Sequence, residues 1–230
     1  MTRTTNARLA GFTYLFYIAV AFPSMILFDG ATDAQGAAAK LARIVAHASN
    51  VRISIVLSVL SCFAALVLAV ALYAITRDED RDLSVLALSC RVGEGVLGAI
   101  PTLAMVGLLW LGTGGAAADA SDATLAAYLL KLRGWGTTAS AIFFAVGSTI
   151  FSWLLLRGRM IPAALAWLGV LASALLVVEL PLELVGVLRS SPATQLIWIP
   201  IAIFELTLGP WLLIKGVAPL RHERAESANH

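Results

Sequence analysis

The sequence predicts an all-α membrane protein, a bundle of six transmembrane helices, and two observations lead to this fold class. Of the 230 residues, 60% are hydrophobic and only 13% are charged. An average soluble domain is about 45–50% apolar and about 25% charged, so this chain has too few polar residues to cover a surface that faces water. The apolar residues also gather into runs of about 20, the length at which a helix crosses a bilayer. A soluble enzyme, a nucleic-acid binder and a disordered protein are therefore excluded.

Six apolar stretches are long enough to cross the membrane as helices. They occupy residues 9–28, 53–75, 83–111, 135–156, 162–188 and 195–217. Barrel strands would alternate with a period of two, which these runs do not, and only helices satisfy their own backbone at this depth. We expect residues 1–217 to form a single transmembrane domain and residues 218–230 to form a polar cytoplasmic tail. The first run is too long for a signal peptide and lacks a cleavage site, so it is interpreted as a retained span.

Two of the loops are longer than the others, and each is predicted to carry a short helix on the outer membrane surface. In the loop 29–52, apolar residues recur at helical spacing. Basic and histidine side chains fall on the opposite face of that segment: Lys40, Arg43 and His47. The second loop offers Asp122 as an N-cap, followed by an amphipathic run over residues 123–132 that ends before Gly134.

The distribution of Lys and Arg predicts the orientation. The side that holds the amino terminus carries nine of them: Arg3, Arg8, Arg77, Arg81, Arg157, Arg159, Lys215, Arg221 and Arg224. The other side carries six: Lys40, Arg43, Arg52, Lys131, Arg133 and Arg189. Because cytoplasmic loops carry the excess of positive charge, both termini are predicted to be cytoplasmic.

Five ionisable residues fall inside the predicted spans and are the strongest functional signal in the sequence. They are Arg91, Glu94, Glu179, Glu183 and Glu205. Each costs about 3 kcal/mol at the bilayer centre, so such residues face the bundle interior or water and need partners. We therefore predict that they bind a ligand or a proton, with the site between the third, fifth and sixth spans. The alternative is that they only fasten helices together through hydrogen bonds.

Spacing and depth add geometry to this prediction. Arg91 and Glu94 are three residues apart and share a helical face, as do Glu179 and Glu183, which are four apart. At about 1.5 Å per residue, Glu94 and Glu205 both reach about 15 Å into the membrane. Arg52 begins the second span near the outer level of the Glu179 pair, where it is a candidate partner at an outer mouth. Prolines within the spans are expected to kink them and make room for a cavity: Pro101, Pro181, Pro200 and Pro210.

Counting charges limits the protonation states that these five side chains can adopt together. Four glutamates face one arginine, so full ionisation would leave a charge of −3 in a low-dielectric interior. Either some glutamates are protonated, or a cation binds, or water and Arg52 compensate. We predict an ion pair between Arg91 and Glu94, and a Glu205 that is at least partly neutral.

These residues favour a protein that binds or transports a small molecule, a proton or a cation. With six spans, alternating access favours a homodimer. One alternative is a non-catalytic membrane interaction or assembly protein, which would have a dry interior in which each glutamate is paired. A second is an intramembrane enzyme acting on a lipid-like substrate, because paired carboxylates can carry out acid–base chemistry. Catalysis is the less favoured interpretation, since the sequence shows no catalytic signature.

No cofactor, haem or metal is predicted. The three histidines all lie outside the spans: His47, His222 and His230. A membrane haem held by two histidines and a buried zinc site both need histidines at depth. Cys62 and Cys90 lie in apolar runs and are interpreted as small buried hydrophobic residues rather than as a disulfide or a metal motif.

Short motifs resemble a known family. The opening Ala7-Arg-Leu-Ala-Gly-Phe-Thr-Tyr-Leu15, the pair Phe143-Phe144, the stretch from Arg157 to Leu171 and the ending Trp211-Leu-Leu-Ile-Lys-Gly-Val217 carry the resemblance. It is to the domain of unknown function 4386 family, which consists of uncharacterised bacterial membrane proteins. The resemblance implies six helices and a bacterial cytoplasmic (inner) membrane as the location. It implies no activity, because none is known for the family.

Overall fold

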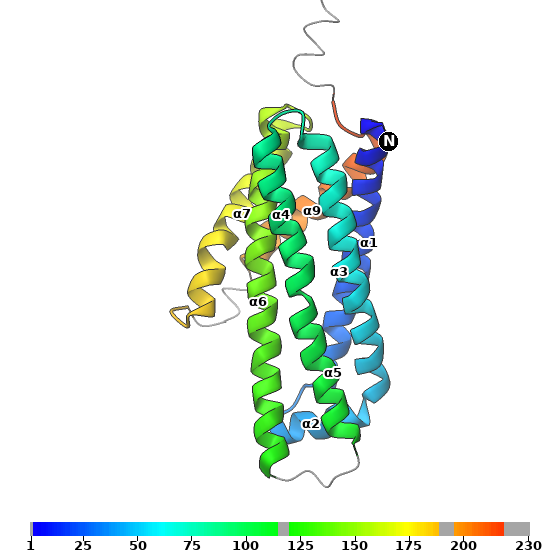
Figure 1. Ribbon diagram of the computed structural model, residues 1–230, viewed down its shortest axis with the longest axis vertical. Helices are drawn as coiled ribbons and strands as arrows, with labels where there is room; N and C mark the ends of the chain where they lie inside the picture. Colours follow the sequence, from blue (N-terminus) through cyan, green and yellow to red (C-terminus); the bar gives the residue numbers. More distant parts are fainter. Residues whose placement is uncertain (1, 115–119, 189–195, 219–230) are drawn as a thin grey trace, which may run out of the picture.

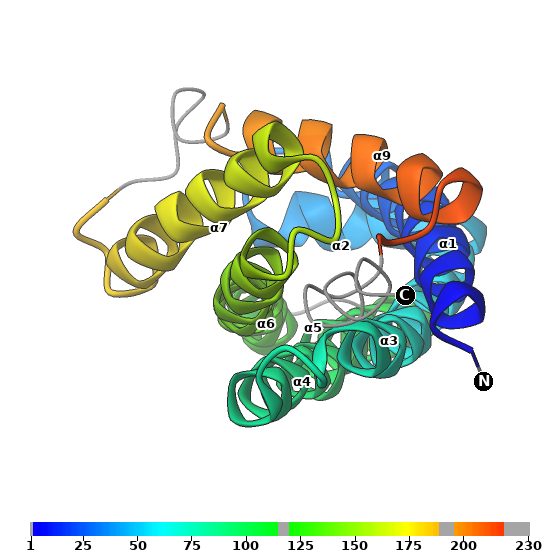
Figure 2. The same ribbon diagram turned by 90° about the horizontal axis from the view of Figure 1, so that it is seen from above.

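The computed structural model describes residues 2–114, 120–188 and 196–218, and these residues form helices without any strand. The long helices run side by side in an elongated bundle (Figure 1). Their bounds are α1 (Arg3–Ala31), α2 (Ala37–Ala46), α3 (Ala48–Thr76), α4 (Arg81–Leu97), α5 (Ala99–Thr113), α6 (Ala120–Arg157), α7 (Ala163–Leu184) and α9 (Trp198–Ile214). Seen from above, α6, α4, α3 and α1 follow an arc, and α7 and α9 lie across its opposite side (Figure 2).

Five helical stretches are long and apolar enough to cross a membrane: α1, α3, α4 with α5, α6 and α7. The sixth predicted span, over 195–217, is not confirmed. Residue 195 lies outside the described residues, and α9 has only 17 residues. That length corresponds to about 25 Å, short of the roughly 30 Å hydrocarbon core.

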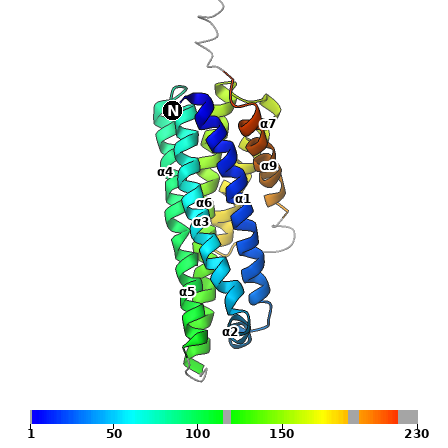
Figure 3. The same ribbon diagram turned by 90° about the vertical axis from the view of Figure 1, so that its right-hand side faces the viewer.

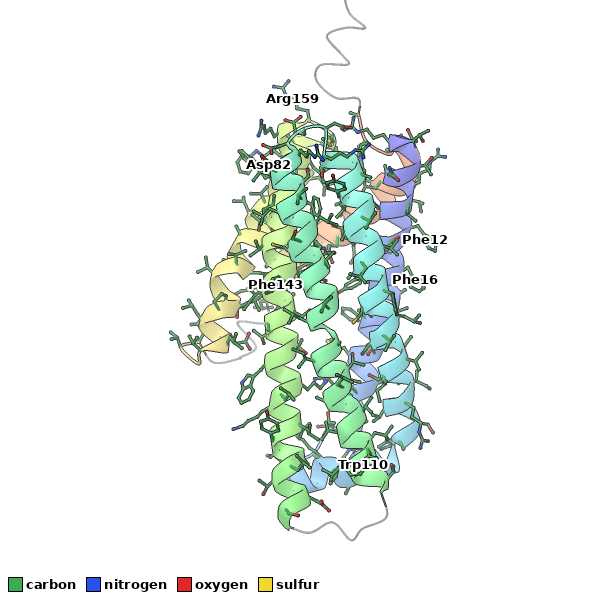
Figure 4. All side chains as sticks on the ribbon, viewed as in Figure 1. Phe12, Phe16, Asp82, Trp110, Phe143 and Arg159 are labelled. Carbon is green, nitrogen blue, oxygen red and sulfur yellow. The ribbon has the colours of Figure 1, made fainter. Side chains whose placement is uncertain are left out.

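Large apolar side chains cover the outside of these helices, including Phe12, Leu103 and Trp110. Phe12 and Phe16 project outward from α1, and Trp110 lies near the far end of α5 (Figure 4). Such continuous apolar exposure is unusual in a soluble monomer and natural for a surface that meets lipid. The protein is therefore a multi-pass membrane protein.

Small residues set how closely the helices pack. Ser24 on α1 and Ser54 on α3 each donate a hydrogen bond to the other's backbone carbonyl, at 2.9 and 2.7 Å. On the other side of α1, a methyl group added to Gly11 would lie 2.5 Å from the carbonyl oxygen of Gly209 on α9. Hydroxyl and glycine contacts of this kind replace the hydrophobic effect as the source of helix association in lipid. They bring α3 and α9 against opposite faces of α1.

The third predicted span, 83–111, divides into two helices at Gly98. The helix α4 ends at Leu97, and α5 begins at Ala99. Pro101 has no amide hydrogen and so cannot donate to the carbonyl of Leu97, four residues earlier. This break falls close to the predicted Pro101 kink, midway along the bundle.

The helix predicted within residues 29–52 is present as α2, but its apolar face meets protein. Leu41 and Ile44 are buried in a cluster that includes Phe28, Met105 and Leu108. Figure 1 shows α2 lying across the end of the bundle, below α3 and α5. This face packs over the ends of α5 and α6. An amphipathic pattern alone does not distinguish this role from binding to a membrane surface.

The second predicted surface helix, over 123–132, is not a separate element. It forms the beginning of α6, which continues through Gly134 to Arg157 as one helix of 38 residues. A glycine inside a helix costs only about 1 kcal/mol. The burial of Ala126, together with Leu129 and Leu130, in the cluster around α2 and α5 compensates for that cost.

The two ends of the bundle separate the basic residues as the sequence predicted. The start of α1, the turn between α3 and α4 and the end of α9 lie at one end, and α2 lies at the other (Figure 3). The turn between α6 and α7 also lies at the first end (Figure 1). Seven of the nine basic residues assigned to one side therefore lie at one physical end of the molecule, and Arg221 and Arg224 lie outside the described residues.

Candidate functional site

The predicted ion pair between Arg91 and Glu94 is present at the centre of the bundle. Arg91 Nη1 lies 2.9 Å from Glu94 Oε2, and Arg91 is fully buried. Tyr17 on α1 adds a hydrogen bond, donating its hydroxyl to Glu94 Oε1 at 3.3 Å. One turn of α4 therefore carries a buried ion pair, and Tyr17 on α1 contacts the carboxylate of that pair.

The packing around Arg91 fixes its side chain. A methyl group on Gly147 of α6 would lie 2.8 Å from Arg91 Cγ, so only a glycine leaves room for the stem. The guanidinium lies 4.8 Å from the centre of the Phe144 ring, and Nη1 donates to Ser148 Oγ at 3.5 Å. Arg91 Nε and Nη2 have no hydrogen-bond partner among the described residues. A guanidinium buried in this way retains donors for water or for another carboxylate.

Glu205 is the second carboxylate near Arg91. It lies buried on α9 and interacts electrostatically with both Arg91 and Glu94. Tyr14 on α1 is buried within reach of the same three charges. The expected neutrality of Glu205 stays a prediction.

Glu179 and Glu183 form a separate pair toward the end of α7. Glu179 is buried, and the charge that acts on it is that of Glu183. Its Oε2 has no hydrogen-bond partner in the described part of the chain. Arg52, the predicted partner at an outer mouth, is exposed at the start of α3 and forms no ion pair with any described residue. The structure thus divides the five predicted residues into two groups, because α7 leans away from the arc that carries Arg91 (Figure 2).

A partly open cavity of about 220 Å³ lies between helices of the bundle, on the Glu94 side of the ion pair. It is lined by α1, α3, α4, α5 and α6 rather than by α7 and α9. Of the three spans between which the Arg/Glu site was predicted, only the third contributes residues to this cavity. The helices α1 and α6 both line the cavity, yet they do not pack against each other in the described residues.

Hydroxyl groups form most of the polar lining of this cavity. They belong to Tyr17, Ser24, Ser58, Ser61, Thr102, Thr137 and Ser140. Ser140 Oγ donates to the Glu94 carbonyl at 2.8 Å, which fixes α6 against α4 at that level. The break at Gly98 and the ring of Pro101 line the wall between these groups.

Arg133 is the residue that sequence reasoning missed. It lines the cavity about 10 Å along α6 from Ser140, given the helical rise over seven residues. Its guanidinium stacks over the Phe28 ring at 4.0 Å, and its ion pair with Asp29 is long, at 3.9 Å, with the Asp29 side chain 60% exposed. Arg133 Nε is buried without a hydrogen-bond partner among the described residues. The spacing of Arg133, Thr137 and Ser140 would have revealed this polar face if the helix had been predicted to continue through Gly134.

No group of three or more His, Cys, Asp or Glu side chains gathers in the described residues in a way that would hold a metal ion. The two cysteines are unpaired, and Cys62 lines the cavity. The cavity therefore offers hydrogen-bond donors, one carboxylate and one guanidinium as its chemistry.

Comparison with protein families gives one match. The family model "Domain of unknown function (DUF4386)" matches residues 9–216. Comparison with curated proteins and with solved structures gives no match.

Proposed function

The chain belongs to the DUF4386 family, and we propose that it binds a small organic molecule with an anionic group inside its bundle. The site is the cavity lined by α1, α3, α4, α5 and α6. The observation that carries this proposal is the position of Arg133, which lines the cavity and, among the described residues, forms its one ion pair with the largely exposed Asp29 at 3.9 Å.

The two charged side chains that line the cavity, Glu94 and Arg133, differ in how completely protein groups already pair with them. Glu94 is paired with Arg91 and accepts the hydroxyl of Tyr17, so it has little need of a cation from a ligand. Arg133 has a buried donor without a partner among the described residues and a planar guanidinium held by stacking on Phe28. Because a guanidinium fork matches a carboxylate or phosphate, this contrast favours an anion over the cation or proton that the sequence suggested.

The size and lining of the cavity define the rest of the ligand. An apolar cavity of about 150 Å³ holds a benzene molecule. A cavity of about 220 Å³ therefore fits a molecule of about ten non-hydrogen atoms. The walls combine hydroxyls with apolar side chains such as Ala21, Ala65 and Met105. This combination favours a ligand with an apolar body, one or two hydrogen-bonding groups and one acidic end.

A transport role is supported by the break between α4 and α5. Broken helices at membrane depth are tolerated where they line a cavity, and in many transporters they form the substrate site. Here Gly98 and Pro101 lie directly on the cavity wall. The competing role as an assembly protein would fit a dry interior with paired glutamates, and this cavity and the unpartnered Glu179 Oε2 count against it. The enzyme alternative has no further support from the geometry.

The setting that we propose is a bacterial inner membrane, with both termini on the cytoplasmic side. The Arg133 end of the cavity would then lie toward the outer face. A homodimer stays a proposal, since a single chain of this size offers little mass for alternating access.

The native Cys62 provides a direct test of the cavity and its charge. In a Cys90→Ser background, purified protein in detergent would react with anionic sulfonatoethyl methanethiosulfonate and cationic trimethylammonioethyl methanethiosulfonate. We expect the anionic reagent to be favoured, and benzoate to protect Cys62 better than benzyl alcohol or benzylammonium of similar size. Mass spectrometry of the intact protein measures both effects.

The matched variants are Arg133→Gln and Arg52→Gln. The first removes the cavity charge and should abolish both the reagent preference and the benzoate protection, whereas the second removes an exposed charge at the same end and should leave them unchanged. A Cys62 that reacts with neither reagent, or that is protected equally by the three compounds, would contradict the proposal.

A further inference from the structure

A second cleft, of about 440 Å³, lies at the end of the bundle that holds the amino terminus. One wall is the tight turn between α6 and α7, over residues 159–162, and the other is the end of α9 with residues 215–218. Trp211 lines the side of the cleft between these walls. Because this cleft shares no residue with the internal cavity, a role for it is independent of the proposed function.

The two walls are joined by the backbone. The amide of Ala218 donates to the carbonyl of Met160 at 2.9 Å, and Met160 is buried beneath the turn. Gly216, with a φ of +69°, ends α9 and turns the chain toward Met160. This hydrogen bond connects the two walls of the cleft in the described residues.

Arg159 occupies a backbone conformation that normally belongs to glycine. Its φ is +52°, and it is the only residue other than glycine with a positive φ in the described part of the chain. For an L-residue with a side chain, this left-handed conformation costs about 1–2 kcal/mol. The amides of Arg159 and Met160 donate to the carbonyls of Leu156 and Leu155, at 3.0 and 2.9 Å, the pattern of a helix C-cap in which glycine is usual. An arginine at this position places a cation at the cleft at the cost of that strain. Figure 4 shows that Arg159 projects from the end of the bundle.

The two cations of the cleft are available to an external anion. Arg159 and Lys215 are both exposed, and neither forms an ion pair with a described residue. Arg157, two residues before Arg159, is by contrast held by Glu79 at 3.2 Å and Asp80 at 3.1 Å. The carboxyl ends of α6 and α9 carry a partial negative charge, which favours cations here and accounts for Lys215. That partial charge does not require an arginine in a strained backbone conformation.

We propose that this cleft binds the phosphate headgroup of an anionic phospholipid. Arg159 and Lys215 would contact the phosphate, and the half-buried indole of Trp211 would lie at the level of the glycerol backbone. The cleft lies at the end of five membrane-crossing helices, which is where headgroups are found. Basic and aromatic side chains are the residues that recognise lipid at this interface.

The experiment measures thermal stability of the full chain in mild detergent with added lipid. Dioleoyl-phosphatidylglycerol should raise the melting temperature of the wild type, and dioleoyl-phosphatidylcholine at the same concentration should not. Inorganic phosphate is the third arm, because it shares the headgroup chemistry without the acyl chains. We expect it to have no effect at lipid concentrations that saturate the shift.

Two variants distinguish lipid binding from a structural role. Arg159→Gly relieves the backbone strain and removes the charge, so the melting temperature without lipid should rise while the shift on adding phosphatidylglycerol is lost. Lys215→Gln should weaken the apparent lipid affinity about fivefold, the effect of about 1 kcal/mol per basic residue. Arg77→Gln, at the same end but outside the cleft, should behave as the wild type.

Three results would overturn the proposal. The first is a lipid-induced shift that survives in Arg159→Gly, and the second is an equal shift with phosphatidylcholine. The third is a full shift with inorganic phosphate, which would identify free phosphate rather than a lipid as the ligand.

Discussion

Two pairs of carboxylates lie on the apolar helices of the bundle, and their surroundings differ. Glu94 and Glu205 come from different helices. Glu94 pairs with the buried Arg91 and accepts from Tyr17, and Glu205 lies within electrostatic range of both Arg91 and Glu94. Glu179 and Glu183 come from one turn of α7, and the charge that acts on Glu179 is that of its neighbour. The first pair is compensated at the centre of the bundle, whereas the second lies on a helix that leans away from it (Figure 2). A buried glutamate is thus informative only together with the helix that faces it.

The largest expected effect comes from removing the cation of the central cluster. Arg91→Met leaves Glu94 and Glu205 buried without a positive partner. Breaking a buried ion pair from one side costs about 3–5 kcal/mol, so the free energy of unfolding should fall by that amount. Unfolding in mixed micelles of increasing denaturing detergent measures it. Arg52→Met is the control and should cause little change, because Arg52 is exposed. A small loss for Arg91→Met would show that the cluster is hydrated rather than dry.

A double-mutant cycle tests whether Arg91 can pair with either carboxylate. In Glu94→Gln, the unpartnered Nε and Nη2 of Arg91 remain free to pair with Glu205, so the loss should be moderate. Losing both carboxylates leaves Arg91 unpaired, and the Glu94→Gln/Glu205→Gln variant should lose about 1–3 kcal/mol more than the sum of the single changes.

The second pair supplies the control for this cycle. Glu94→Gln combined with Glu179→Gln should be additive within about 0.5 kcal/mol, because Glu179 does not interact with Arg91. Both cycles are measured by the same unfolding titration. Additivity in the first cycle would mean that Glu205 does not stabilise the charge of Arg91.

An effect smaller than that of Arg91→Met is expected at the glycines of α6. Gly147→Ala places a methyl group against the stem of Arg91 and should cost about 1–3 kcal/mol through overpacking. Gly134→Ala is the matched change on the same helix, and no atom lies within 4 Å of the added methyl group. It should stabilise the protein by up to about 1 kcal/mol through helix propensity. Melting temperatures of the two variants test this, and a shift in the same direction for both would contradict the packing described for Arg91.

Local patterns in the sequence were enough for much of the fold and for part of the site. Runs of apolar residues predicted the positions of five membrane-crossing stretches, and the i,i+3 spacing of Arg91 and Glu94 predicted their ion pair, which is confirmed. The amphipathic pattern near Lys40 predicted α2. These features depend on neighbours within one helix, which a single sequence reveals directly.

Features that depend on contacts between helices were not predictable in this way. The continuation of α6 through Gly134 rests on packing against α2 and α5, and it made Arg133 a cavity residue instead of a loop residue. The same contacts turned the apolar face of α2 inward. Periodicity shows that a face is apolar but not whether lipid or protein covers it.

The sequence by itself therefore determined that the protein is a helical membrane protein and that Arg91, Glu94, Glu179 and Glu205 are buried. It did so because the cost of burying polar groups in lipid leaves a direct record in composition and spacing. Only the tertiary structure decided which of those charges meet. The lean of α7, the close crossing of α1 and α9 at Gly11 and the length of α6 are set by side-chain packing across the bundle. Those contacts place Glu205 within electrostatic range of Arg91, leave Glu179 apart and put Arg133 in the lining of the cavity.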